Sequence, residues 1–127
     1  MNESKNIKVL VVKPEQVPTV AEYEDRLESW QQLVGGFIEL FYPFEDDVAI
    51  LCNDEGKIDG LPLNRAIKDD NGEILDIIAG TFAVVGLDDE DGFRSLTDEE
   101  LKKYAELYAV PEVFIGMDGR IVAVPLF

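Results

Sequence analysis

The sequence contains no histidine, a single cysteine and few basic residues: 11 Lys and Arg stand against 27 Asp and Glu, a formal net charge of −16. Without histidine the chain lacks the commonest general base and metal ligand, which excludes Ser-His-Asp and Cys-His catalysis. The lone Cys52 cannot form an intramolecular disulfide or a cysteine-rich zinc site. The negative charge also argues against direct binding of nucleic-acid phosphates. We therefore expect a non-enzymatic protein with no metal and no other cofactor.

Long apolar runs are missing too. The run 7–12 is too short for the core of a secretion signal or for a membrane span, and the run 77–87 is interrupted by glycines. A lone cysteine is typical of a reducing compartment. We expect a cytoplasmic protein that does not bind membranes.

What the sequence has is material for one core. In 127 residues, 46% hydrophobic side chains are enough to bury a core of ordinary size, which argues against disorder despite the charge. No repeat, linker or low-complexity segment divides the chain. We expect one globular domain over residues 1–127.

The apolar pattern predicts short strands and two helices. Asp25 is the expected N-cap of a helix that ends at Gly35, and Thr97 begins a second helix with a capping box. Asp118-Gly119 predicts a hairpin turn. Strands are predicted over 8–12, 19–23, 37–44, 48–52, 81–85, 113–115 and 121–124, and a single helical turn over 63–67. Residues 74–78 form a further apolar stretch. Since strands and helices do not alternate, we predict the α+β class, with a mostly antiparallel sheet of about five to seven strands and two main helices.

Two segments carry a resemblance to a known family. They are Gly-Leu-Pro-Leu-Asn-Arg at 60–65 and Ile-Ile-Ala-Gly-Thr-Phe at 77–82, with support from 33–39 and 47–53. Over about residues 6–110 the chain resembles the bacterial domain of unknown function DUF3846, while about 111–127, the C-terminal hairpin, lies outside the resemblance. The resemblance implies an accessory protein of a phage, plasmid or conjugative element, often encoded near antirestriction genes. It transfers no known activity, because none is assigned to the family.

Acidic residues gather in two predicted loops, and two interpretations of them stay open. Carboxylates that share one face can imitate DNA phosphates and engage a basic host protein, such as a DNA-binding or defence enzyme. Carboxylates spread over all faces only keep the protein soluble. Loops starting at Asp69 and Asp88 lack the ligand spacing of an EF-hand, so we expect no calcium site. The candidate interaction surface comprises Glu45, Asp46, Asp47, Asp88, Asp89, Glu90 and Asp91.

A small-ligand pocket is the alternative function. Asn64 and Arg65 follow a rigid segment that we expect to be an exposed loop, and Asp76 lies in an apolar stretch. The bidentate fork of Arg65 suits an anion such as a signalling nucleotide. A structural role for the same three residues stays open, as do the oligomeric state and whether the hairpin closes the domain or mediates association.

Overall fold

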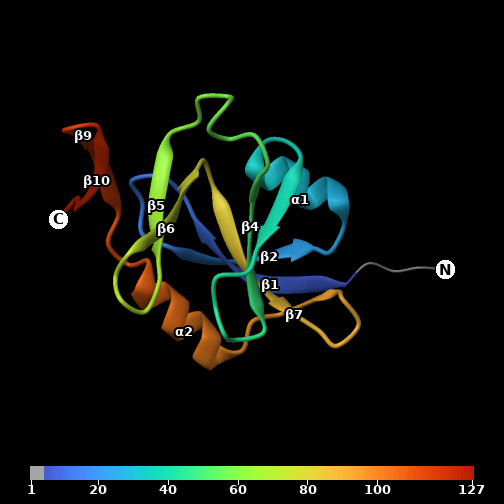
Figure 1. Ribbon diagram of the computed structural model, residues 1–127. Coiled ribbons are helices and arrows are strands. Elements are labelled where there is room, and N and C mark those ends of the chain that lie inside the picture. Colours follow the sequence, from blue (N-terminus) through green and yellow to red (C-terminus); the bar gives the residue numbers. More distant parts are fainter. Residues whose placement is uncertain (1–4) are drawn as a thin grey trace.

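A six-stranded antiparallel sheet forms the centre of the protein in the computed structural model, which describes residues 5–127. Five strands follow the order β2-β1-β7-β4-β3, and the short β8 pairs with the end of β7 (Figure 1). These strands are β1 (Asn6–Val12), β2 (Thr19–Glu24), β3 (Ile38–Phe41), β4 (Val48–Asn53), β7 (Phe82–Leu87) and β8 (Phe93–Arg94). The predicted α+β class with a mostly antiparallel sheet is confirmed.

Both faces of this sheet are covered, which explains the continuous apolar runs of its central strands. Alternate residues of each strand point to opposite faces. In β4, Val48 and Ile50 pack on one face, and Ala49 and Leu51 on the other. Helix α1 (Leu27–Val34) contributes Trp30 to the core on the Ala49 and Leu51 face. Helix α2 (Asp98–Leu107) covers the core on the Val48 and Ile50 face. Three layers result.

Helix α1 does not begin as the sequence predicts. Its N-cap is Arg26, which makes no side-chain capping bond, and Asp25 lies one residue earlier. The Asp25 carboxylate instead accepts a hydrogen bond from the indole Nε1 of Trp30 at 3.2 Å. The predicted end is confirmed, because Gly35 takes the left-handed φ of 82° that glycine tolerates best.

Helix α2 begins at the predicted capping box. The Thr97 hydroxyl accepts from the backbone N–H of Glu100 at 3.1 Å, and the Glu100 carboxylate accepts from the Thr97 N–H at 2.9 Å. Acidic residues occupy the first turn, where the helix dipole favours them. The predicted start of this helix is confirmed.

The segment predicted as a helical turn is a strand. Residues 63–67 fall within β5 (Leu63–Lys68), which pairs with β6 (Ile74–Ala79) as a separate two-stranded sheet over the α2 side of the main sheet. Asn64 and Arg65 are 0% and 1% exposed, so the expected exposed loop is also wrong. Pairing with β6 and burial against the core outweigh the local sequence preference of residues 63–67 for a helical turn.

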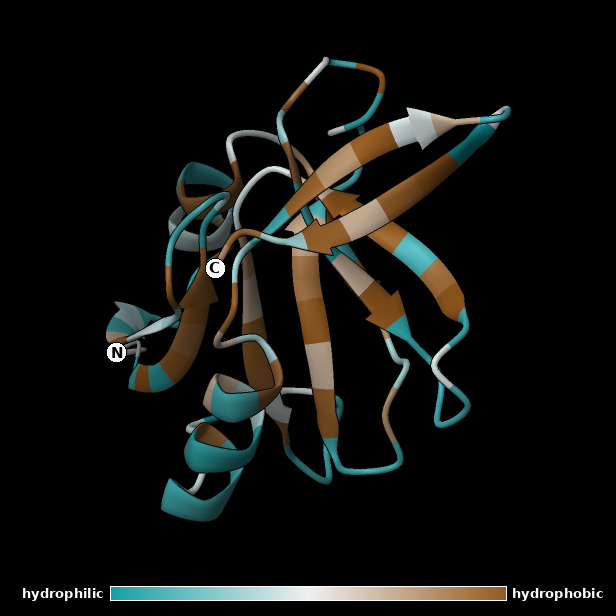
Figure 2. Ribbon diagram, turned by 90° about the vertical axis from the view of Figure 1, so that its left-hand side faces the viewer, coloured by the Kyte–Doolittle hydropathy of each residue, from teal (hydrophilic) through white to brown (hydrophobic). Residues whose placement is uncertain are grey.

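The C-terminal hairpin forms as predicted. Strands β9 (Glu112–Met117) and β10 (Arg120–Pro125) pair antiparallel in a sheet of their own. Asp118 and Gly119 both have positive φ, 51° and 77°, as a tight type I′ turn requires. Figure 2 shows this hairpin extending from the body, with a hydrophilic tip and mostly hydrophobic strands.

Neither helix within residues 5–127 has the length and apolar character needed to cross a lipid bilayer.

The Cys52 thiol is expected to be unreactive in the folded protein. It is 4% exposed, and burial, with nearby acidic groups, raises the pKa of Cys52 to about 12, so the reactive thiolate is scarce at neutral pH. Ellman's reagent should label Cys52 only after denaturation. A Cys52→Ser, Gln32→Cys variant, with its thiol on an exposed helical position, should react at once when native. Equal native rates for the two thiols would contradict the burial argument.

Candidate functional site

The two predicted acidic loops lie side by side at one end of the central strands β4 and β7. Loop 45–47 precedes β4 and loop 88–91 follows β7, and these strands are antiparallel neighbours, with Val48 opposite Gly86. The backbone N–H of Leu87 donates to the carbonyl of Asp47 at 2.9 Å. We call this region the acidic end; it comprises Glu45, Asp46, Asp47, Asp88, Asp89, Glu90 and Asp91.

Arg94 ties the two loops of the acidic end together. Its guanidinium donates to the carbonyl of Leu87 at 3.0 Å and to that of Asp47 at 3.1 Å, and it pairs with Glu100 of α2 at 2.8 and 3.0 Å. Gly86 makes room for it, since an added Cβ would lie 2.7 Å from Arg94 Nη1. Sequence analysis missed Arg94; the available signal was one arginine between two acidic runs.

Asp88 shapes its loop and remains ionised. Its Oδ1 accepts from the backbone N–H groups of Glu90 and Gly92, both at 2.8 Å. These bonds favour the carboxylate and lower the pKa of Asp88 below its ordinary value. The loop is therefore held in one shape while Asp89, Glu90 and Asp91 stay exposed.

Asp46 links the acidic end to α2. Its Oδ2 accepts from Lys103 Nζ at 2.6 Å and from the Tyr104 hydroxyl at 2.7 Å, which lowers the pKa of Asp46. The ring of Tyr104 packs on Phe44, with centroids 4.7 Å apart. Of the seven acids, this one is engaged by a cation, while Glu45 and Asp47 remain exposed.

A cleft of about 750 Å³ opens beside the acidic end, between loop 43–46, α2, the β5–β6 turn and the start of the hairpin. Tyr104 and Tyr108 form its apolar wall. Its charges are of both signs, because Lys68 and Lys103 face it together with acids that include Asp46. The cleft therefore shows no preference for an anion.

Arg65 borders that cleft, but its guanidinium is fully occupied. Its five N–H groups donate to the carbonyls of Tyr108, Gln16 and Asn64 and to the Asn64 side chain, at 2.6 to 3.3 Å. Burial lowers the pKa of Arg65, and the carboxylate of Glu112 opposes this effect. Since protein acceptors take every N–H donor, the guanidinium of Arg65 has no donor left for a ligand. It joins β5 to Tyr108 and to the β1–β2 loop instead.

Asn64 and Asp76 do not join Arg65 in a pocket. The Asn64 amide donates to the carbonyls of Val12 and Gly80, both at 2.9 Å. The half-buried Asp76 pairs with Lys57 at 2.6 Å and accepts from the N–H of Ile77. Each predicted ligand-binding residue therefore has a separate set of protein partners.

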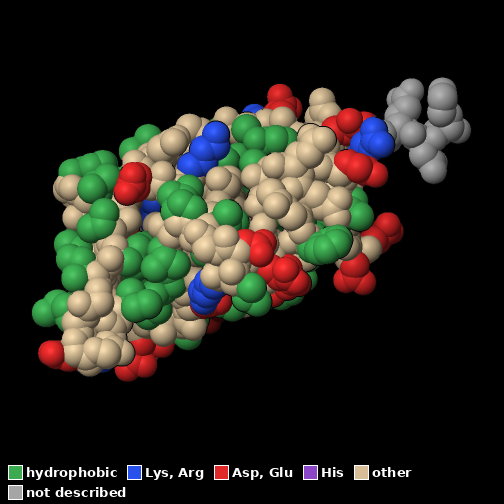
Figure 3. All heavy atoms as spheres, turned by 90° about the horizontal axis from the view of Figure 1, so that it is seen from above, with side chains coloured by type: hydrophobic (Ala, Val, Ile, Leu, Met, Phe, Trp, Pro, Cys, Tyr) green, Lys and Arg blue, Asp and Glu red, His purple; other side chains and the backbone are tan. Residues whose placement is uncertain are grey.

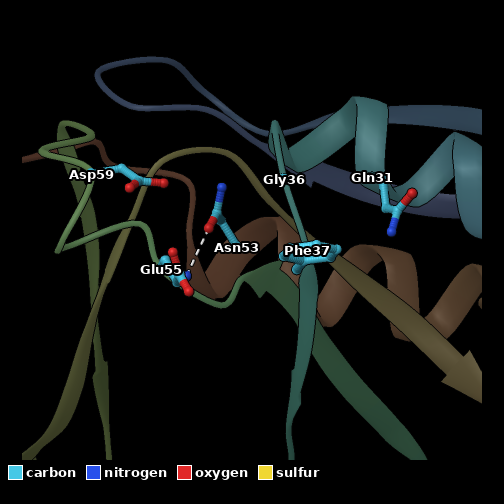
Figure 4. Close-up of a pocket in the computed structure, with 6 residues that line it drawn as sticks. All are labelled: Gln31, Gly36, Phe37, Asn53, Glu55 and Asp59. Carbon is cyan, nitrogen blue, oxygen red and sulfur yellow. Dashed lines mark hydrogen bonds between the residues drawn. The ribbon is translucent and has the colours of Figure 1, made fainter.

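A shallower hollow of about 340 Å³ lies at the opposite end of β4 (Figure 4). Phe37, 71% exposed, and Gln31 of α1 stand on one side, with Glu55 and Asp59 on the other. Asn53 lies between them, fixed by the carbonyl of Val34 and the N–H of Glu55. The acids of this hollow would repel phosphate, so it does not suit a nucleotide.

Among residues 5–127, no group of three or more cysteine and acidic side chains is arranged to hold a metal ion. The model of one protein family, described as a domain of unknown function (DUF3846), matches residues 7–109. The match ends before the β9–β10 hairpin. No curated protein and no solved structure matches the chain.

The Arg94–Glu100 pair should make stability depend on acid pH. Arg94 and the Thr97 N–H lower the pKa of Glu100 below its ordinary 4.5. The stabilisation is therefore complete above about pH 4.5 and is lost as the pH falls through the lower, folded-state value. We expect Glu100→Gln to cost about 1–2 kcal/mol at neutral pH, and the gap in melting temperature to narrow steadily as the pH falls below 4.5. Glu99→Gln, on the exposed turn, is the control; a Glu100→Gln gap that is constant with pH would contradict the argument.

Replacing Arg65 should destabilise the fold even when the charge is kept. Lysine has three donors on one nitrogen and cannot reach the acceptors that the planar guanidinium spans. The buried carbonyl of Tyr108 and the carbonyl of Gln16 would lose this donor, so Arg65→Lys should lower the free energy of unfolding by about 2–4 kcal/mol in urea titrations. The exposed Arg26→Lys should change it by less than about 0.5 kcal/mol. Equal effects of the two substitutions would contradict this account.

Proposed function

Because the chain belongs to the DUF3846 family of domains of unknown function, whose name assigns no activity, we propose its function from the acidic end. The protein is a non-enzymatic accessory protein that binds a basic partner through this surface. The mobile-element context implied by the resemblance makes a restriction or other DNA-binding enzyme of the host the fitting partner. The cleft in which that host enzyme binds DNA phosphates would receive the carboxylates of the acidic end instead.

The adjacency of the two acidic loops carries this proposal. Five of the seven acids are exposed, and the loops are fixed by Arg94 and by the bond from Leu87 to Asp47. A partner therefore meets carboxylates that are already in place, and the two loops of this protein lose little conformational entropy on binding. Concentrated charge also raises the association rate of a basic protein.

The signalling-nucleotide alternative has less support. An anionic ligand needs a free cationic group, and all N–H donors of Arg65 have protein acceptors. Asp76 pairs with Lys57 and shares no pocket with Arg65. The net charge of −16 would repel the ligand at long range, whereas the same charge attracts a basic protein.

The proposal predicts salt-sensitive binding to purified DNA-binding and restriction proteins of the host. Affinity should fall at least about tenfold as sodium chloride rises from roughly 50 to 300 mM, because screening shortens the reach of exposed charges. A variant that neutralises four exposed acids, Glu45→Gln, Asp89→Asn, Glu90→Gln and Asp91→Asn, should weaken binding about tenfold or more, chiefly through the association rate measured by surface plasmon resonance.

The matched control removes the same number of charges at the opposite end of the sheet, in the β1–β2 loop and just after β4, with Glu15→Gln, Asp54→Asn, Glu55→Gln and Asp59→Asn, all exposed. This variant should keep most of the affinity. Equal weakening by both variants would reduce the effect to net charge and overturn the acidic end as the binding surface. Absence of binding across the panel at low salt would overturn the proposed function.

A further inference from the structure

The β9–β10 hairpin, with the residues that follow it, is an apolar arm with little of its own surface covered. Among the other elements of residues 5–127, only β5 packs extensively against it. Six large apolar side chains of the arm are at least one-third exposed. They are Ile115 at 47%, Met117 at 55%, Ile121 at 52%, Val122 at 36%, Leu126 at 44% and Phe127 at 75%. An isolated hairpin is marginally stable in water, so this arm gains from being covered.

Both faces of the arm are apolar, unlike a strand pair with one solvated face. Ile115 lies opposite Val122 on one face, and Phe114 lies opposite Ala123 on the other. Figure 3 shows hydrophobic side chains gathered at the end of the molecule where Figure 1 places the hairpin. A contiguous exposed patch of this kind is typical of an interaction surface.

Beyond Glu112 at its base, which accepts from the backbone N–H of Ala66 at 2.9 Å, the arm is electrically neutral in a strongly acidic protein. From residue 113 to 127 the charged side chains are Asp118 and Arg120, of opposite sign, so the charge of −16 resides elsewhere in the chain. A second copy that approached through another surface would meet strong like-charge repulsion. Through the arm, two copies can meet without it.

We propose that β10 pairs with β10 of a second copy, so that two arms form one four-stranded antiparallel sheet across a two-fold axis. Within residues 5–127, β10 pairs with β9 alone, and its other edge is open. Residues 121–124 are all uncharged, so antiparallel self-pairing places no like charges opposite each other at the centre. Two-fold dimers are the commonest closed assemblies.

The exposed side chains of the arm supply part of the area that such a dimer needs. The four exposed large apolar side chains of β10 and the residues after it are Ile121, Val122, Leu126 and Phe127. At roughly 100 Å² for each half-exposed large side chain, they provide about 400 Å² per copy, against about 800 Å² per partner in a standard interface. The open backbone edge of β10 adds to this area. The arm lies outside the region matched by the family model, 7–109.

Sedimentation equilibrium of the full chain tests the dimer. Wild type at about 100 µM should give twice the chain mass of 14.2 kDa. The dimer should be retained or strengthened as salt rises, because salt screens repulsion between the acidic bodies. This is the opposite of the salt dependence expected for a basic partner at the acidic end, so the two proposals fail independently.

Two variants locate the contact. Ile121→Glu in the arm should give a monomer, and Ile58→Glu, which adds the same charge at an 84% exposed site outside the arm, should remain a dimer. Circular dichroism and thermal unfolding should show that both variants fold. A monomeric wild type, an assembly larger than two, or a folded Ile121→Glu dimer would each overturn the proposal.

Discussion

The hydrogen bonds of the buried Arg65 side chain are the interactions on which the position of the β5–β6 sheet depends. Arg65 joins β5 to the end of α2 through the carbonyl of Tyr108 and to the β1–β2 loop through the carbonyl of Gln16. Asn64 extends the junction to the main sheet through Val12. Removing a charge from water is costly, and here five charge-assisted hydrogen bonds offset the cost.

This junction also positions the elements that carry the proposed functions. Tyr108 caps the C-terminal end of α2, and the chain enters β9 four residues later. At the other end of the same helix, Glu100 meets Arg94, which holds the two acidic loops. Fixing α2 therefore fixes both the acidic end and the base of the hairpin arm, although these surfaces lie in different parts of the molecule.

Sequence patterns were sufficient where a local rule determines structure. The capping box at Thr97, the left-handed Gly35 and the Asp118-Gly119 turn are such cases, because each depends on neighbouring residues alone. The pattern failed at Asp25, whose partner is an indole five residues away, and at 63–67, where pairing with β6 decides the conformation. The closeness of the acidic loops follows from the β4–β7 pairing, which apolar periodicity does not determine.

The acidic end raises the question of how two loops rich in carboxylates remain together. The backbone bond from Leu87 to Asp47 continues the β4–β7 pairing past the strand ends, so main-chain geometry brings the loops together. Arg94 then offsets repulsion from beneath: its side chain is only 31% exposed, and its donors point at carbonyls and at Glu100 rather than at the exposed acids. The cation stabilises the loops without neutralising their outer surface, and a partner still meets negative charge.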